Sequence, residues 1–543
     1  MKLPLKSTLF ILVLIILMGA GLRFYHLGSK SLWVDEIVAS YVASGPDLKA
    51  TNADIPYIIN QRYKDVSPPL RDFIANYSFR IWGVNELGLR FFPACFGVLG
   101  ILLIFIIARD WLKDEKTALL SALVFSILPF HIQHSQDGRM YTLFMFYTLA
   151  SFYAMYKALH TREKRLLWAS LYVILNSLSI YHSYFGFWAL ITQFIIGIYW
   201  IYFPDSEYGS ATHEKKITLL SLFVGIHGII AIIYTPWLKA IYQFIKTHGN
   251  PPAPYQVPFI QATPSTEVSR NFMYHLQPNF TFIESLVHEF GLPGISGWIM
   301  FALGILGTFY IYRDNSKRKA IGLALWIIIP IIITFAPPPK VLFFNRYICF
   351  ILPIYILLVS IGALRLVNEI LTRFRIKPDM RSTLSLIIIS CLFTAATASS
   401  LINYYSTDKQ PWRKAVRYIM DNAEDNDIVI TGPYNANWCT LYYMQKAGAV
   451  RKDIGKLPNG GEWNILTFPN GKKMAIGEKM QYVGDISPYI EVFPRVWYIT
   501  AYYRTYQYRN PAYYNYLESE KSYMEIFRGD SRENNIYVFL MEK

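Results

Sequence analysis

The chain has 543 residues, of which 53% are hydrophobic and 17% aromatic, while only 16% are charged. Soluble globular proteins carry about 25% charged residues, so this composition excludes an ordinary soluble protein and favours one that crosses a membrane several times. The net charge of +15 does not indicate a nucleic-acid partner, because the lysines and arginines stand in short clusters between apolar segments. That distribution follows the positive-inside rule of membrane proteins.

Eleven stretches are predicted to span the membrane, since a helix needs roughly 20 apolar residues to do so. They lie near 8–24, 90–108, 117–134, 141–158, 167–182, 186–203, 217–236, 293–312, 320–337, 347–364 and 384–401. The predicted fold class is therefore an α-helical polytopic membrane protein with eleven transmembrane helices. The first stretch is expected to remain as an anchor, because no small-residue cleavage site follows it.

Basic residues recur on one side of this predicted topology. They follow alternate spans near 109–116, 162–165, 215–216, 313–319 and 365–381, and Lys2 and Lys6 precede the first span. The positive-inside rule makes this side cytoplasmic. We therefore expect a plasma (inner) membrane protein with a cytoplasmic N-terminus, whose long segments at 25–89, at 237–292 and after about 402 lie outside.

Two domains are predicted, a transmembrane domain at 1–403 and an extracytoplasmic domain at 404–543. The tail has an amphipathic helix pattern at 412–423 and strand patterns at 427–431, 495–500 and 536–540. Helices that alternate with strands are typical of a small α/β domain.

The two long external loops differ in pattern. Loop 25–89 has helical spacing at 33–43 and 55–63, which predicts short helices on the membrane surface. Loop 237–292 is rich in proline and aromatic residues, and loops of that length are commonly functional, so we expect a lid over the external face.

Two adjacent carboxylates, Asp35 and Glu36, follow the first span where the chain meets water. Acidic groups near hydrocarbon are costly and are usually kept for function. Neighbours on a helix point roughly 100° apart, so the two carboxylates are expected to take different roles. The alternative is an acidic first turn of a surface helix, stabilised by the helix dipole.

A polar stretch between the third and fourth spans contains His131, His134 and Asp137. Their spacing of three residues would place them on one face of a continuing helix. Together with Asp35 they are candidate ligands for a divalent metal cation, the one cofactor that the sequence indicates. The alternative, which the spacing favours, is a set of polar residues at a helix end.

Four cations stand at the external ends of spans, where the positive-inside rule disfavours them. They are Arg90, Arg139, Lys340 and Arg346. Arginine suits bidentate phosphate contacts, although arginines also snorkel at interfaces without a further role. A transporter would place ionisable groups near the midplane, and the span interiors carry almost none. The pattern therefore favours an active site at the outer edge.

Six short motifs, in this order and on the external side, resemble those of the multispan GT-C glycosyltransferases, in particular the protein O-mannosyltransferase and aminoarabinose transferase group. They are Leu32-Trp33-Val34-Asp35-Glu36, Ser67-Pro68-Pro69-Leu70, Leu89-Arg90-Phe91-Phe92-Pro93, the stretch 135–141, Arg346-Tyr347 with Pro353, and Gln410-Pro411-Trp412-Arg413. Two positions depart from the group, which often has His or Lys at Ser67 and has Glu at Asp137.

The resemblance implies transfer of a monosaccharide from a polyprenyl-phosphate carrier to a glycolipid, protein or cell-envelope glycan on the extracytoplasmic face. It implies that Asp35 is the general base and Glu36 its motif partner, and we add Asp137 as a third catalytic candidate. The four external cations are assigned to the donor phosphate. The pocket candidates are Trp33, Pro68, Pro69, Tyr141 and Tyr347. A lipid-linked saccharide flippase is the main alternative, and a membrane sensor is a weaker one.

Overall fold

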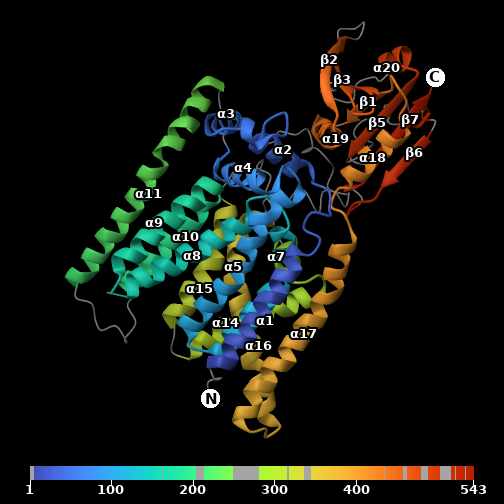
Figure 1. Ribbon diagram of the computed structural model, residues 1–543. Coiled ribbons are helices and arrows are strands. Elements are labelled where there is room, and N and C mark those ends of the chain that lie inside the picture. Colours follow the sequence, from blue (N-terminus) through green and yellow to red (C-terminus); the bar gives the residue numbers. More distant parts are fainter. Residues whose placement is uncertain are drawn as a thin grey trace.

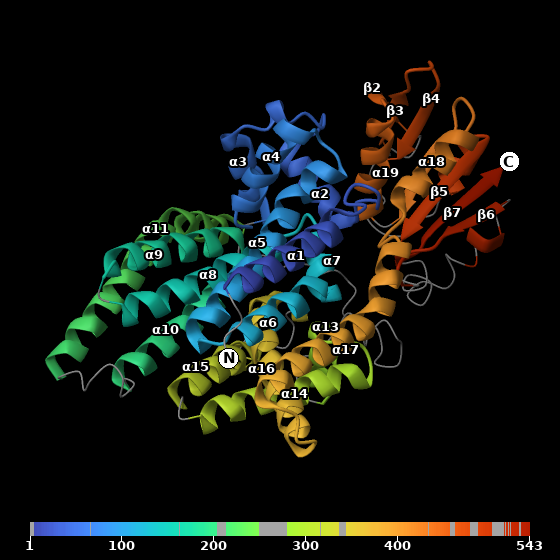
Figure 2. The same cartoon turned by 60° about the horizontal axis from the view of Figure 1, so that its bottom comes forward.

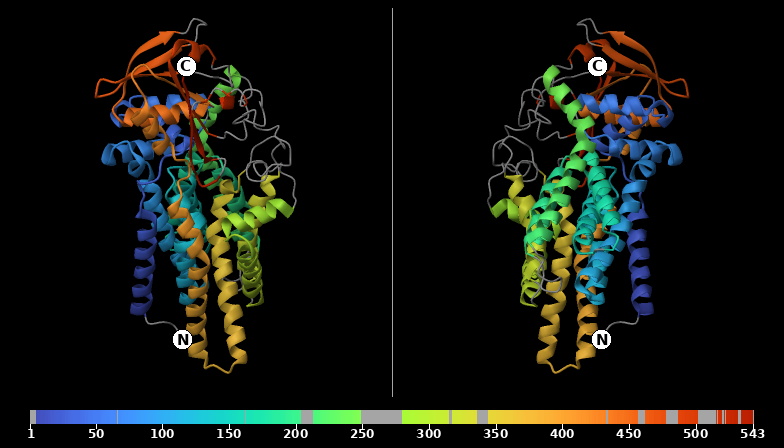
Figure 3. Two further views of the ribbon diagram at one scale, coloured as in Figure 1. Left: turned by 90° about the vertical axis from the view of Figure 1, so that its right-hand side faces the viewer. Right: turned by 90° about the vertical axis from the view of Figure 1, so that its left-hand side faces the viewer.

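The computed structural model describes residues 5–542 apart from 66, 162, 204–212, 249–279, 315–316, 336–343, 433, 457–461, 478–486, 502–514, 516, 520, 522 and 532–533. Long helices form an elongated bundle, short helices cover one end of it, and a C-terminal unit with a β-sheet lies beyond them (Figures 1 and 3). The N-terminus lies toward the opposite end of the molecule from the C-terminus (Figure 3).

Each of the eleven predicted stretches coincides with a helix or a pair of helices. These are α1 (Leu5–Phe24), α5 (Glu86–Leu112), α6 (Glu115–Ile127) with α7 (Pro129–Ser135), α8 (Tyr141–His160), α9 (Arg165–His182), α10 (Gly186–Tyr202), α11 (His213–His248), α14 (Ile295–Arg313), α15 (Lys317–Thr334), η4 (Asn345–Ile351) with α16 (Leu352–Arg373), and α17 (Pro378–Ser406).

Fewer of these helices meet a strict criterion for a membrane span. Among the described residues, six are long and apolar enough by length and composition, or seven if the bent pair α6–α7 is one span. Helix α10 has 17 residues and is too short for this criterion. The structure therefore supports a multi-pass membrane protein, whereas the number of eleven spans stays a prediction.

A proline ends the third predicted span early. Helix α6 stops at Ile127, and Pro129 is the first residue of α7. Proline lacks the N–H that would continue the helix and clashes with the preceding turn. The two helices meet at a bend of 60°. Because of this bend, α7 and the loop after it lie at the end of the bundle.

The short helices at that end are α2 (Val34–Ser44), η1 (Ala50–Asn52), α3 (Ile55–Asp65) and α4 (Leu70–Trp82). The two predicted helical patterns in this loop are confirmed by α2 and α3, while α4 was not predicted. Asn76 of α4 holds the loops together, since its Nδ2 lies 2.8–3.0 Å from the carbonyl oxygens of Ala43, Ala50 and Ala53.

The C-terminal unit contains a seven-stranded mixed sheet within the described residues, in the order β2-β3-β4-β1-β5-β7-β6. Strands β1, β4 and β5 are parallel, and the other pairs are antiparallel. The elements are α18 (Trp412–Asn422), β1 (Ile428–Gly432), α19 (Tyr434–Lys446), β2 (Val450–Lys456), β3 (Glu462–Thr467), β4 (Lys473–Gly477), α20 (Ser487–Val492), β5 (Arg495–Ala501), β6 (Tyr523–Phe527) and β7 (Ile536–Glu542). The predicted helix and all three predicted strands are present.

This unit packs directly on the short helices. One buried hydrophobic cluster includes Leu32 and Ile37 from the region of α2 together with Trp412 and Tyr442 from α18 and α19. Helices α2 and α19 lie side by side (Figures 1 and 2). The C-terminal unit is therefore fixed against the same end of the bundle as the motif Asp35-Glu36.

Two predictions fall partly or wholly on undescribed residues. Helix α11 continues to His248 and α13 (Phe280–Phe290) occupies the end of the predicted loop, so the loop is shorter than expected, and its role as a lid stays a prediction. The remainder, 249–279, lies outside the described residues, as does Lys340.

Candidate active site

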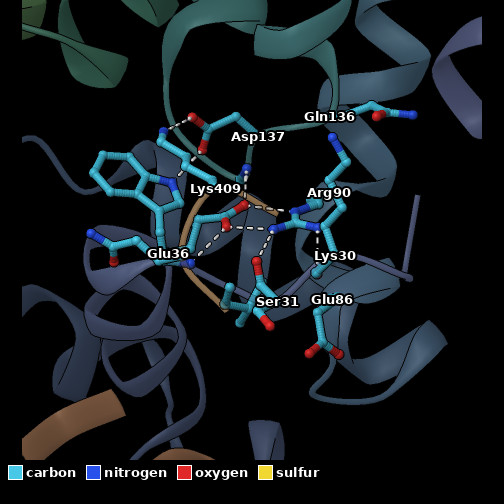
Figure 4. Close-up of polar contacts among 12 residues, drawn as sticks. Lys30, Ser31, Glu36, Glu86, Arg90, Gln136, Asp137 and Lys409 are labelled. Carbon is cyan, nitrogen blue, oxygen red and sulfur yellow. Dashed lines mark hydrogen bonds and ion pairs between the residues drawn. The ribbon is translucent and has the colours of Figure 1, made fainter. Parts of the chain in front are cut away.

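Glu36 is the central anchor of the site at the N-terminus of α2. Its carboxylate reaches back one turn to accept a hydrogen bond from the backbone N–H of Trp33 (3.3 Å), as in a capping box. It also accepts from the backbone N–H of Gly138 (2.8 Å) and from Arg90 Nε and Nη2 (2.7 and 2.6 Å) (Figure 4). The side chain is fully buried. Glu36 thus joins α2, α5 and the loop after α7.

All N–H donors of Arg90 take part in this hydrogen-bond network. Besides the two bonds to Glu36, its Nη1 donates to the carbonyls of Leu27 and Lys30 and its Nη2 donates to that of Ser31. A guanidinium has five N–H donors, and all five are used. The prediction that Arg90 binds a donor phosphate is therefore wrong in this structure, because it has no donor left for one.

Asp35 points to a different side of the same helix turn, as its spacing predicts. Its side chain is 30% exposed, whereas that of Glu36 is 0% exposed. Its Oδ2 lies 3.4 Å from Nη2 of Arg139. Of the two adjacent carboxylates, Asp35 is the one that a substrate can reach.

Asp137 holds the loop after α7 against the start of α2. Its Oδ1 accepts a hydrogen bond from Trp33 Nε1 (3.2 Å), and its Oδ2 lies 3.5 Å from Lys409 Nζ (Figure 4). Burial opposes its charged form, but the positive charges of Lys409 and Arg139 help to hold the pKa of Asp137 below its ordinary value. Asp137 is therefore an anion at neutral pH and is unsuited to act as an acid.

Lys409 was not among the predicted site residues. It belongs to the segment between α17 and α18, and its ammonium lies 3.4 Å from the centre of the Trp33 ring. The next residue, Gln410, accepts a hydrogen bond from the backbone N–H of Val34 (3.3 Å). The signal in the sequence was a cation directly before the motif Gln410-Pro411-Trp412-Arg413.

Replacing Lys409 with Met should lower kcat/KM for the reaction proposed below by about tenfold, because a partly buried cation–π contact is worth about 1–2 kcal/mol. Lys409→Arg should retain most of the activity, and Lys414→Met, at a 69% exposed side chain, serves as the matched control. An unchanged kcat/KM in Lys409→Met would remove Lys409 from the site.

Arg346 is the most available cation of the described set. Its guanidinium lies 4.2 Å from the ring centre of Phe344, 5.7 Å from that of Tyr141 and 5.8 Å from that of Trp33. Its Nε has no hydrogen-bond partner among the described residues. The aromatic faces stabilise the charge without using the N–H donors, so that, among the described residues, the Nε–H stays free for an anion.

The remaining pocket candidates lie in three places. Trp33 and Tyr141 surround Arg346, whereas Pro68 and Pro69 are buried at the start of α4, and Pro69 lines an apolar groove. The Tyr347 ring stacks on Phe185 with centroids 4.2 Å apart.

The four candidate metal ligands do not form a site. His131 Nδ1 lies 2.6 Å from Nη2 of Arg23, and its ring packs on Phe125. A guanidinium next to an imidazole repels a metal cation. Within the described residues no group of three or more His, Cys, Asp or Glu side chains could hold a metal ion, so the predicted set Asp35, His131, His134 and Asp137 is wrong.

Comparisons with known proteins agree with this architecture. Residues 66–234 match the family model of dolichyl-phosphate-mannose-protein mannosyltransferases. An undecaprenyl phosphate-alpha-4-amino-4-deoxy-L-arabinose arabinosyl transferase of Pectobacterium carotovorum is 24% identical over 334 residues, which are 60% of this chain and 54% of the relative. The chain spans about a quarter to about a half of the length of the curated relatives it matches.

The whole chain superimposes on a solved structure. A crystal structure of ArnT from Cupriavidus metallidurans in the apo state aligns over 98% of both chains, with a TM-score of 0.57 and 12% identity. The structure of ArnT bound to undecaprenyl phosphate aligns over 97% of both chains, with a TM-score of 0.53 and 12% identity. The chain therefore has the fold of these ArnT structures. It is a multi-pass membrane protein that is similar to the mannosyltransferase family and to the arabinosyl transferase named above.

Proposed function

We propose that the chain is a glycosyltransferase that moves a monosaccharide from a polyprenyl-phosphate carrier to an acceptor at the extracytoplasmic face. The observation that carries this proposal is the reachable carboxylate of Asp35 beside Arg139, with an Asp35 Oδ2 to Arg139 Nη2 distance of 3.4 Å. A base and a phosphate-binding cation are thereby adjacent at one end of an apolar helix bundle.

In this mechanism Asp35 is the general base. Its carboxylate accepts the proton of an acceptor hydroxyl while the acceptor oxygen forms a bond to the anomeric carbon of the donor sugar. The bond from that carbon to the phosphate oxygen breaks, and the phosphate keeps the electron pair. The sugar passes through an oxocarbenium-like state, which a nearby carboxylate favours.

The leaving phosphate needs positive charge at the moment it departs. Arg139 and Arg346 supply it from fixed positions, since Arg139 pairs with Asp35 and Arg346 is held among aromatic rings. Glu36 and Asp137 are buried and hydrogen-bonded, so they act by positioning α2 and the loop after α7.

The membrane topology and the acceptor belong to the proposal. We place the N-terminus in the cytoplasm and the C-terminal unit outside the plasma (inner) membrane, with membrane lipids around the bundle. The acceptor is a glycolipid, a protein or an envelope glycan. The gathering of ionisable groups at one end of the bundle, rather than at the middle, favours a transferase over a flippase.

The test uses the full chain in lipid nanodiscs with radiolabelled undecaprenyl-phosphate-linked aminoarabinose or mannose, and with lipid, peptide and glycan acceptors. We expect label to move to one acceptor class with release of undecaprenyl phosphate. Transport of donor across liposomes without any acceptor, and without release of undecaprenyl phosphate, would instead support the flippase.

A further inference from the structure

The connection between α1 and α2, residues 25–33, contains no helix or strand. Where such a segment packs against protein, its backbone N–H and C=O groups need hydrogen-bond partners. Here the partners of five consecutive carbonyls are two arginines from distant parts of the chain, Arg90 of α5 and Arg413 of α18. Arg90 donates to the carbonyls of Leu27, Lys30 and Ser31 (3.0–3.3 Å) (Figure 4), and Arg413 donates to those of Gly28 and Ser29 (3.2 and 2.9 Å).

Two N–H groups at the end of this connection are held from the C-terminal side of the molecule as well. The N–H of Leu32 donates to the hydroxyl oxygen of Tyr443 in α19 (2.7 Å). That hydroxyl in turn donates to Oε1 of Glu86 (3.1 Å), which fixes its orientation. The N–H of Val34 donates to Gln410, in the segment that leads to α18. The C-terminal unit therefore holds both polar sides of the backbone that leads into α2.

The position of Asp35 depends on this backbone. Val34 is the first residue of α2 and Asp35 is the second, so the place where the helix begins determines where the Asp35 carboxylate lies. The carboxylate itself is 30% exposed, and its ion pair with Arg139 is 3.4 Å long. Glu36 fastens α2 to the bundle through Arg90. Arg413 and Tyr443 supply a second attachment, and this one comes from the C-terminal unit.

We propose that the C-terminal unit is part of the catalytic machinery, because Arg413 and Tyr443 are positioning residues that hold Asp35 in place to accept the proton of the acceptor hydroxyl. This inference rests on the proposed function and adds to it a role for the C-terminal unit. Residues that only recognised the acceptor would contribute to KM for that acceptor. Residues that position the base contribute to kcat, with every acceptor that the protein uses.

Tyr443→Phe tests the inference, since it removes one oxygen atom and keeps the ring. In single-turnover transfer by the full chain in nanodiscs, it should lower the rate constant about tenfold to 100-fold, because a displacement of about 1 Å can cost about 100-fold. KM for the acceptor and the Kd of undecaprenyl phosphate should stay at the wild-type values. Tyr442→Phe is the matched control, because the neighbouring Tyr442 hydroxyl has no hydrogen-bond partner among the described residues.

Arg413→Gln should lower the rate constant in the same way, and Arg417→Gln, at a 78% exposed side chain one turn further along α18, is its control. The double variant Tyr443→Phe/Asp35→Asn should transfer at the rate of Asp35→Asn alone, since residues that act as a unit are not additive. Thermal unfolding identifies any variant that fails to fold, and Tyr443→Phe still tests the inference if Arg413→Gln does so.

The inference and the proposed function fail in different ways. A wild type that transfers, beside unchanged rate constants in Tyr443→Phe and Arg413→Gln, would overturn the positioning role and leave the proposed function standing. A full further loss on adding Tyr443→Phe to Asp35→Asn would also overturn it, because Tyr443 would then act independently of the base. Absence of transfer by the wild type to any acceptor class would instead overturn the proposed function itself.

Discussion

Replacing Asp35 with Asn is expected to lower kcat/KM for sugar transfer by about 100- to 10,000-fold, the usual contribution of a positioned general base. Asn has nearly the same shape but cannot accept the proton of the acceptor hydroxyl. The fold should tolerate the change, because the Asp35 side chain is 30% exposed and is not part of the buried network around Glu36. Single-turnover transfer in nanodiscs, with saturating donor, measures the chemical step directly.

Donor binding separates this role from a structural one. Asp35→Asn removes the carboxylate that pairs with Arg139, so the affinity for undecaprenyl phosphate should be unchanged or higher. Asp47→Asn, at an exposed carboxylate after the same helix, is the matched control. Transfer at the wild-type rate in Asp35→Asn would assign the proton to another group and make the proposed mechanism wrong.

The helices were predictable because their cause is local. Runs of apolar residues determine which segments leave water, and each of the eleven predicted stretches contains a helix. The spacing argument for Asp35 and Glu36 also succeeded, since neighbours on a helix point in different directions. The spacing could not predict which of the two carboxylates, Asp35 or Glu36, is buried.

That choice depends on a residue far away in the chain. Glu36 is buried because α5 brings Arg90 within 2.6 Å of it, and no local pattern reports how two helices are aligned. The same alignment explains the wrong role for Arg90, whose five donors are used by Glu36 and by carbonyls of the preceding loop. In the sequence, a cation at the external end of a span looks the same whether it binds a donor phosphate or pairs with a buried carboxylate.

The metal prediction failed where a helix ends. The spacing of His131, His134 and Asp137 assumed a continuing helix, but α7 ends at Ser135 and Asp137 lies in the following loop. Lys409 was missed for a related reason. It reaches Trp33 only because the C-terminal unit packs on α2.

Replacing Glu36 with Gln should destabilise the protein strongly, by about 3–5 kcal/mol, because it leaves the buried guanidinium of Arg90 without its counter-charge. We expect a lower apparent Tm in detergent and loss of transfer, since α2 and the loop at Gly138 lose their common anchor. The double variant Glu36→Gln/Arg90→Gln should lose less stability than the sum of the two single variants, as expected for residues in direct contact. Glu86→Gln, whose carboxylate pairs instead with the half-exposed Arg413, is the matched control with a smaller effect. Strictly additive losses in the double variant would show that the Glu36–Arg90 pair is not the anchor of the site.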